Sequence, residues 1–172
     1  MKPSEPSRRI YGTMLLLVAL WCSLIVLAPL LQSFAGETQT VASVIYKFYS
    51  RICHQLDDRS FHIGGEKFAV CIRCSAIYFS FFAGLALVPL LQGLGNRTPP
   101  QRRWLMAAML PMLVDVLLSV SGIHASTDLT RFVTGSLLGV TVPLYIVPIL
   151  FDSLAKLSES SKGEPLYARK TE

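Results

Sequence analysis

The chain has 172 residues, of which 52% are hydrophobic and only 16% are charged, and its mean hydropathy is +0.48. Soluble domains carry about 25% charged residues, so this composition argues against a soluble enzyme or a DNA-binding domain. The net charge of +5 comes from basic residues that flank apolar runs, which predicts the lipid bilayer as partner and no nucleic acid.

The apolar residues gather in runs of about 20, the length at which a helix crosses a bilayer. We predict membrane spans at residues 10–34, 71–94, 104–122 and 132–151. A signal peptide cleaved after Ala35 is a competing interpretation of the first run, but this run exceeds the roughly 7 to 15 residues of a signal core. Pro143 and Pro148 are expected to kink the fourth span.

A segment of different character, residues 41–55, precedes the second span. Polar residues recur there at helical spacing, opposite an apolar stripe of Val41, Val44, Ile45, Phe48, Tyr49 and Ile52. This pattern predicts an amphipathic helix that lies in the headgroup region. The predicted fold class is therefore all-α, an integral membrane four-helix bundle with an additional interfacial amphipathic helix. A single transmembrane domain at 1–152 would precede a disordered tail at 153–172.

The distribution of positive charge predicts the orientation. Ten of the 16 Lys and Arg residues lie in the N-terminal segment, the loop before Trp104 and the tail. Because cytoplasmic segments are enriched in Lys and Arg, we expect a multi-pass protein of the cell inner (cytoplasmic) membrane with both termini cytoplasmic. The loop before the second span would then lie on the extracytoplasmic face.

Three of the four cysteines lie within that loop or at its far boundary. Cys53 stands beside His54, and Cys71 and Cys74 bracket the start of the second span, where one helical turn places their sulfurs on the same side. Two thiolates at this spacing can share a tetrahedral ion with a distant Cys and a His. The predicted metal ligands are thus Cys53, His54, Cys71 and Cys74, with His62 as a substitute for His54 and zinc or another transition metal as the cofactor.

Two other functions are also consistent with the sequence. Cys71 and Cys74 could form the active pair of a membrane thiol-disulfide oxidoreductase, with Cys53 as the shuttle, because a helix N-terminus favours reactive thiolates. The small size also suits a non-enzymatic subunit of a larger membrane complex, or a homo-oligomer. Three cysteines are an odd number, which favours metal over a simple disulfide. Whether the protein is an enzyme stays open.

One acidic residue, Asp115, lies deep within the third predicted span. An ionised carboxylate at mid-bilayer costs roughly 3 kcal/mol or more, so a partner is expected. Arg131 at the mouth of the fourth span is the first candidate, and Arg73 is the second. A structural pair that sets helix register and a role in proton handling or in orienting a ligating His both remain open.

Small residues predict where helices approach closely. Gly135 and Gly139 form one stripe in the fourth span, and Ser80 and Gly84 form another in the second. Such spacing is typical of tight packing between membrane helices.

Several motifs together carry a resemblance to a known family. They are Cys53-His54-Gln55, Arg59-Ser60-Phe61, Cys71-Ile72-Arg73-Cys74-Ser75-Ala76-Ile77-Tyr78, Leu110-Pro111-Met112 with Asp115, Arg131, Thr134-Gly135 and Gly139. In these elements the chain resembles small prokaryotic membrane proteins catalogued as domain of unknown function 2085. Ser75-Ala76 departs from the glycine expected there, without touching the sulfurs. The resemblance implies several membrane helices with an outer cysteine motif, and it supplies no activity.

Overall fold

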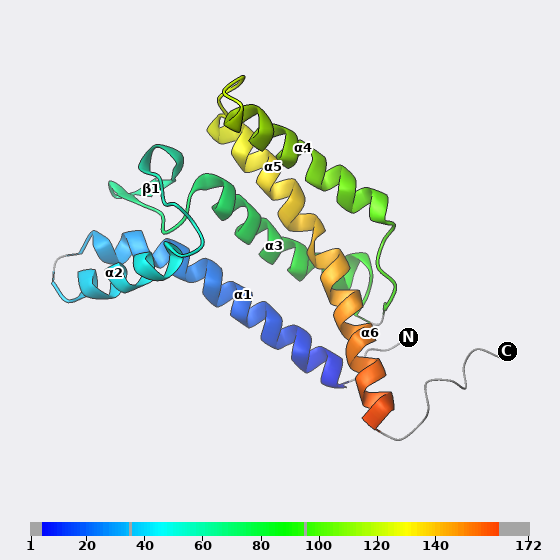
Figure 1. Cartoon of the computed structure of the whole chain (residues 1–172). Coiled ribbons are helices and arrows are strands. Elements are labelled where there is room, and N and C mark those ends of the chain that lie inside the picture. The colour runs from blue at the N-terminus through cyan, green and yellow to red at the C-terminus, as the bar shows by residue number, and fades with distance from the viewer. Residues whose placement is uncertain (1–4, 35, 95, 162–172) are drawn as a thin grey trace.

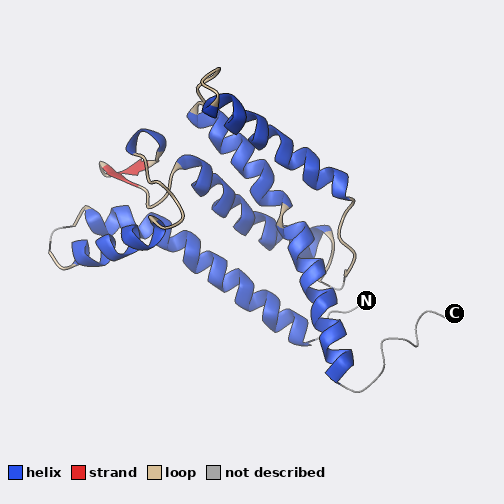
Figure 2. Ribbon diagram, in the orientation of Figure 1, coloured by secondary structure: helices blue, strands red, loops and turns tan. Residues whose placement is uncertain are grey.

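The computed structural model describes residues 5–34, 36–94 and 96–161. The described residues are mostly helical, and a two-stranded hairpin supplies the strands among them (Figure 2). The helices are α1 (Glu5–Gln32), α2 (Thr38–Tyr49), α3 (Ile72–Leu91), α4 (Arg102–Val120), α5 (Asp128–Thr141) and α6 (Pro143–Ser161), with a 3-10 turn at Asp57–Arg59. The hairpin pairs β1 (His62–Ile63) with β2 (Glu66–Lys67) in antiparallel register.

Four helical segments among the described residues are long and apolar enough to cross a membrane, which confirms the predicted all-α membrane architecture. They are Arg8–Gln32, Ile72–Leu91, Arg102–Val120 and Asp128–Leu157. Each overlaps one of the predicted spans. The start of α1 and the end of α6 lie at one end of the molecule, whereas α2 and the hairpin lie at the other (Figure 1).

The fourth span is broken into α5 and α6 at Val142, next to Pro143, as predicted, whereas Pro148 lies inside the uninterrupted helix α6. Pro143 has no N–H to continue the ladder and its ring clashes with the preceding turn. The backbone N–H of Tyr145 instead bonds to the carbonyl of Val142 at 3.0 Å. The helix then continues to Ser161, beyond the start of the predicted tail at 153, and an ion pair between Lys156 and Asp152 supports it there. Residues 162–172 of that tail lie outside the described residues.

Helix α2 ends at Tyr49 rather than at residue 55, because the chain turns there toward α3. Its apolar stripe is also divided. Ile45 and Tyr49 are buried against α1, and the Tyr49 hydroxyl donates a hydrogen bond to the carbonyl of Trp21 at 2.8 Å. The rest of the stripe is about half exposed or more, namely Val41, Val44, Phe48 and Ile52.

Helices α3 and α5 pack closely through their small residues, as their spacing predicted. A methyl group built on Gly139 would lie 3.0 Å from the Cα of Ile77 and closer still to its carbonyl oxygen. Gly135 faces Ala76 and Gly84 faces Val140 in the same way. This contact fixes the start of α3, which carries two of the cysteines, beside the start of α5.

Candidate metal centre

Cys53 lies just past α2, two residues before Gln55. The backbone at Gln55 has φ of 51°, a left-handed conformation that non-glycine residues rarely adopt. Its side-chain amide donates to the carbonyls of Tyr46 and Ala69 at 2.8 and 2.7 Å. One amide therefore joins the end of α2 to the segment that leads into α3, and Cys53 is held between them.

Cys71 and Cys74 lie at the N-terminus of α3. Cys71 is the N-cap residue, with extended backbone angles, and Cys74 follows one helical turn later. Their Sγ atoms are 3.6 Å apart. The backbone N–H of Cys71 donates a hydrogen bond to the Sγ of Cys53 at 3.2 Å, so the loop cysteine meets the helix cysteines directly.

These three residues form what we call the three-cysteine cluster. Their Sγ atoms all lie within 4.8 Å of one another, with Cys53 buried and the other two half-buried. Hydrogen bonds from the thiols of Cys71 and Cys74, and then from the backbone N–H groups of Cys71 and Gln55, lower the pKa of Cys53. A tetrahedral zinc ion with Zn–S bonds of about 2.3 Å separates its sulfurs by about 3.8 Å, so the cluster is close to the size that such an ion requires.

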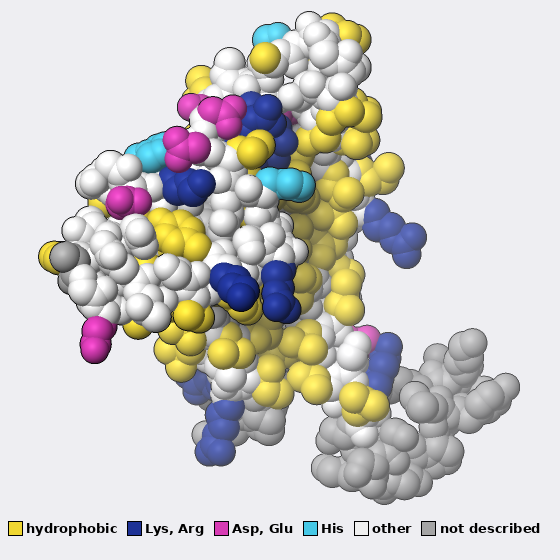
Figure 3. Space-filling model, turned by 60° about the vertical axis from the view of Figure 1, so that its left-hand side comes forward, with side chains coloured by type: hydrophobic (Ala, Val, Ile, Leu, Met, Phe, Trp, Pro, Cys, Tyr) yellow, Lys and Arg dark blue, Asp and Glu magenta, His cyan; other side chains and the backbone are white. Residues whose placement is uncertain are grey.

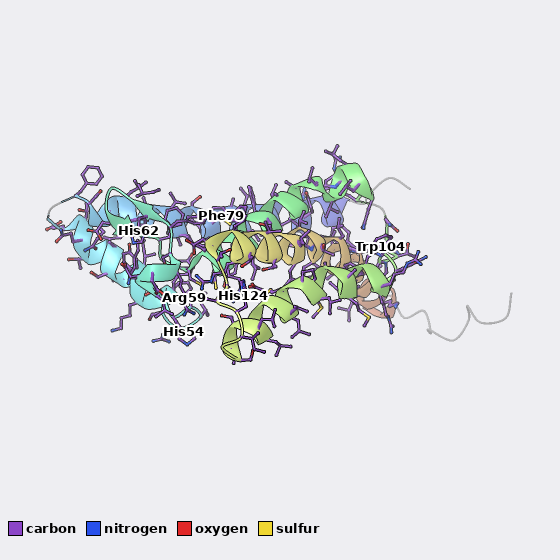
Figure 4. The ribbon with its side chains drawn as sticks, turned by 90° about the horizontal axis from the view of Figure 1, so that it is seen from above. His54, Arg59, His62, Phe79, Trp104 and His124 are labelled. Carbon is purple, nitrogen blue, oxygen red and sulfur yellow. The ribbon has the colours of Figure 1, made fainter. Side chains whose placement is uncertain are left out.

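Neither predicted histidine joins the cluster. Within the described residues, only the three cysteines form a group of metal-ligand spacing. His54 is exposed and lines a cavity beside the cluster. His62, on β1, is also exposed, and its Nε2 lies 3.4 Å from Asp57. Figure 4 shows His54 near Arg59 and His62 further along the hairpin.

Asp115 pairs with Arg73, so the prediction that placed Arg131 first was wrong. The Nη2 of Arg73 forms an ion pair with Oδ2 of Asp115 and also reaches the hydroxyl of Ser126 at 3.3 Å. Arg131 instead contacts Asp128, three residues earlier on α5, at 3.3 Å. An Arg at the start of one helix and an Asp near the end of another meet because those two helix ends are adjacent.

Asp115 lies in the last third of α4. It stands near the C-terminal end of α4 at Val120, about 8 Å from that end at 1.5 Å per residue. Because Arg73 stands between Cys71 and Cys74, the ion pair adjoins the three-cysteine cluster.

A cavity of about 190 Å³ opens beside the cluster. The three cysteines line it together with His54, Arg59, Arg73 and Arg131. Figure 3 shows charged and histidine side chains gathered on one part of this face of the molecule, next to a broad apolar surface. Both arginines of the predicted polar site therefore lie at the cysteine site, although only Arg73 contacts Asp115.

Sequence reasoning did not assign roles to Gln55, Ser126 and Arg59. Gln55 and Arg59 stand within the Cys53-His54-Gln55 and Arg59-Ser60-Phe61 motifs, which are the only signal that the sequence offers for them. Ser126 is buried in the connection between α4 and α5, where its hydroxyl donates to the backbone carbonyl of Asp115 at 3.3 Å. Nothing in its local sequence distinguishes it from its polar neighbours.

Comparisons with known proteins support the membrane architecture. A family model described as "Predicted membrane protein (DUF2085)" matches residues 53–158. An uncharacterized protein of Methanocaldococcus jannaschii is 38% identical over 136 residues, which cover 77% of this chain and 86% of that protein. An uncharacterized protein of Methanothermobacter thermautotrophicus is 29% identical over 92 residues, covering 52% of this chain and 78% of that protein. No solved structure matches.

Proposed function

The chain belongs to the DUF2085 family of membrane proteins, and from its own residues we propose that Cys53, Cys71 and Cys74 bind a transition metal ion. The single observation that carries this proposal is the convergence of three thiols within 4.8 Å from two separate segments. Thiolates are soft ligands that select zinc among the abundant divalent metals of the cell by ligand type and tetrahedral geometry. Zinc is the ion proposed.

The proposed ion has two consequences for the protein. It fastens the loop that carries Cys53 to the start of α3, and three protein ligands leave one of four tetrahedral positions open. All three cysteines line the cavity beside the cluster, so the open coordination position would face this cavity. His54, on the rim of the same cavity, would reach the ion only by moving.

Metal analysis of the purified protein tests the proposal. We expect about one zinc ion per chain in wild type and none in a Cys71→Ser, Cys74→Ser double variant. Cys22→Ser is the matched control, because Cys22 is buried in α1 and its thiol contacts the carbonyl of Tyr78 at 3.4 Å. Metal that is absent from wild type, or unchanged in the double variant, would refute the site.

A second candidate function is thiol-disulfide exchange, which the 3.6 Å separation of the Cys71 and Cys74 sulfurs favours. Rapid alkylation followed by mass spectrometry separates the two functions. A redox pair should be trapped as a disulfide or a mixed disulfide with substrate, whereas a zinc site should yield three free thiols after chelation.

We further propose that the cluster lies on the extracytoplasmic side of the cytoplasmic membrane, with both termini in the cytoplasm. The N-terminal segment, the loop before α4 and the C-terminal segment hold ten of the 16 Lys and Arg residues, which supports this orientation through the positive-inside bias. The start of α1 and the described end of α6 lie together and away from α2 (Figure 1).

Epitope insertion tests this orientation. A tag between Gly64 and Gly65, in the exposed turn of the hairpin, should bind antibody on intact spheroplasts. A tag between Arg97 and Thr98, before α4, should bind only after permeabilisation. The reverse pattern would place the termini outside and overturn the proposed orientation.

A further inference from the structure

The cavity beside the three-cysteine cluster has a strongly basic lining. It lies between the loop after α2, the start of α3 and the start of α5. Its lining includes the side chains of Arg59, Arg73 and Arg131 and that of His54, and no described acidic residue lines it. Three guanidinium groups around a space of about 190 Å³ form a surface that matches the geometry of a carboxylate or phosphate group.

Arg131 contributes the most unusual side chain of this lining. It is only 11% exposed, and its contact with Asp128 uses one of its nitrogens at 3.3 Å, while Asp128 itself is 64% exposed. A guanidinium group carries five N–H donors. Arg131 is nearly buried and its acidic partner is largely in solvent. Its guanidinium group therefore keeps N–H donors that are available to the cavity.

Arg73 also keeps unused donor capacity. Its Nη2 serves both Asp115 and Ser126, whereas its Nε is buried and has no hydrogen-bond partner among the described residues. Buried donors without partners are uncommon, because each costs about 1 to 3 kcal/mol. The ion pair with Asp115 holds this guanidinium at the cavity wall next to the cysteines.

We propose that this cavity binds a small oxyanion, a carboxylate or phosphate group, which occupies the open position of the metal ion while Arg131 and Arg73 donate to it. This inference rests on the proposed metal site. Metal and guanidinium groups converging on one anion would neutralise its charge from two sides. The bound group would belong either to a soluble anion or to a lipid headgroup.

Cobalt substitution tests the inference, since the visible spectrum of Co²⁺ reports its coordination geometry. The full-length protein in neutral detergent is loaded with Co²⁺, its metal content is measured, and inorganic phosphate or acetate is titrated in. We expect a saturable spectral change with at least one of the two anions. Arg131→Gln should weaken that response at least tenfold with unchanged cobalt content, and Arg131→Lys should restore it in part. Arg51→Gln, an exposed residue outside the cavity, is the control and should respond as wild type does.

The outcomes separate this inference from the proposed metal site. Stoichiometric cobalt with no response to either anion, as would occur if His54 filled the fourth position, overturns the anion site and leaves the metal site standing. An equal response in Arg131→Gln also overturns it. Loss of cobalt in Arg131→Gln with no anion response in wild type would show that the arginines only balance thiolate charge. Failure of wild type to bind cobalt before any anion is added defeats the proposed function itself, and the inference with it.

Lipid nanodiscs identify the source of the anion. If the spectrum of the liganded form appears in phosphatidylglycerol discs but not in phosphatidylcholine discs, without added anion, the headgroup supplies the oxyanion. If the spectrum of the liganded form appears in both kinds of disc only after phosphate or acetate is added, a soluble anion supplies the oxyanion. Either result supports the proposal.

Discussion

Arg73 on α3 forms an ion pair with Asp115 on α4, although α4 packs chiefly against α5. The pair is therefore a polar link between two helices that otherwise have little contact. Because Arg73 stands between Cys71 and Cys74, this link also connects α4 to the three-cysteine cluster. Ser126 bonds to both partners and closes the connection between α4 and α5 over them.

The ion pair leads to a stability prediction. Asp115→Asn leaves Arg73 without its anionic partner in a site where the two side chains are 21% and 9% exposed, and removing one partner of a buried pair costs about 3 to 5 kcal/mol. Asp128→Asn removes a largely exposed partner, which costs about 0 to 1 kcal/mol. Thermal unfolding of both variants in detergent should show a large loss of stability for Asp115→Asn and little change in stability for Asp128→Asn. Equal effects would contradict this assignment of partners.

Gln55 is predicted to position Cys53. Gln55→Ala removes two hydrogen bonds, each contributing about 1 kcal/mol, and frees the loop that carries Cys53. We expect zinc affinity to fall about 10- to 100-fold, as it does when groups that orient a metal ligand are removed. Competition with a chromophoric chelator measures this affinity. Gln39→Ala, which alters an exposed side chain on α2, is the control, and a Gln55→Ala variant with wild-type affinity would remove Gln55 from the site.

The contact between α3 and α5 predicts that Gly139 tolerates no side chain. Gly139→Ala would force its methyl group against the backbone of Ile77, and overpacking of this kind costs about 1 to 3 kcal/mol. Gly12→Ala on α1 meets nothing within 4 Å and should be neutral or slightly stabilising, because Ala favours a helix more than Gly does. The thermal unfolding midpoint of Gly139→Ala should therefore fall, whereas that of Gly12→Ala should stay unchanged or rise slightly. A Gly139→Ala protein as stable as wild type would show that the two helices can separate there.

Features set by local sequence could be predicted. The length of an apolar run determines whether a helix can span a bilayer, and Pro143 lacks the N–H that would continue the backbone ladder of the fourth span. The spacing of Gly135 and Gly139 likewise indicated a close helix contact. The end of α2 at Tyr49 could not be predicted in this way, because the segment after it is held by a contact that is distant in sequence, the hydrogen bond from the Gln55 amide to the carbonyl of Ala69.

The sequence by itself determined that this chain spans a membrane with helices and that two cysteines, Cys71 and Cys74, stand one helical turn apart at the start of one span. Both are properties of neighbouring residues, namely the apolar content of about 20 consecutive residues and the spacing within one helical turn. Only the tertiary structure decided that Cys53 meets Cys71 and Cys74 while His54 does not, and that Asp115 pairs with Arg73 rather than Arg131. Those choices depend on which helix ends lie side by side, and the packing of α3 against α5 through glycines sets that arrangement.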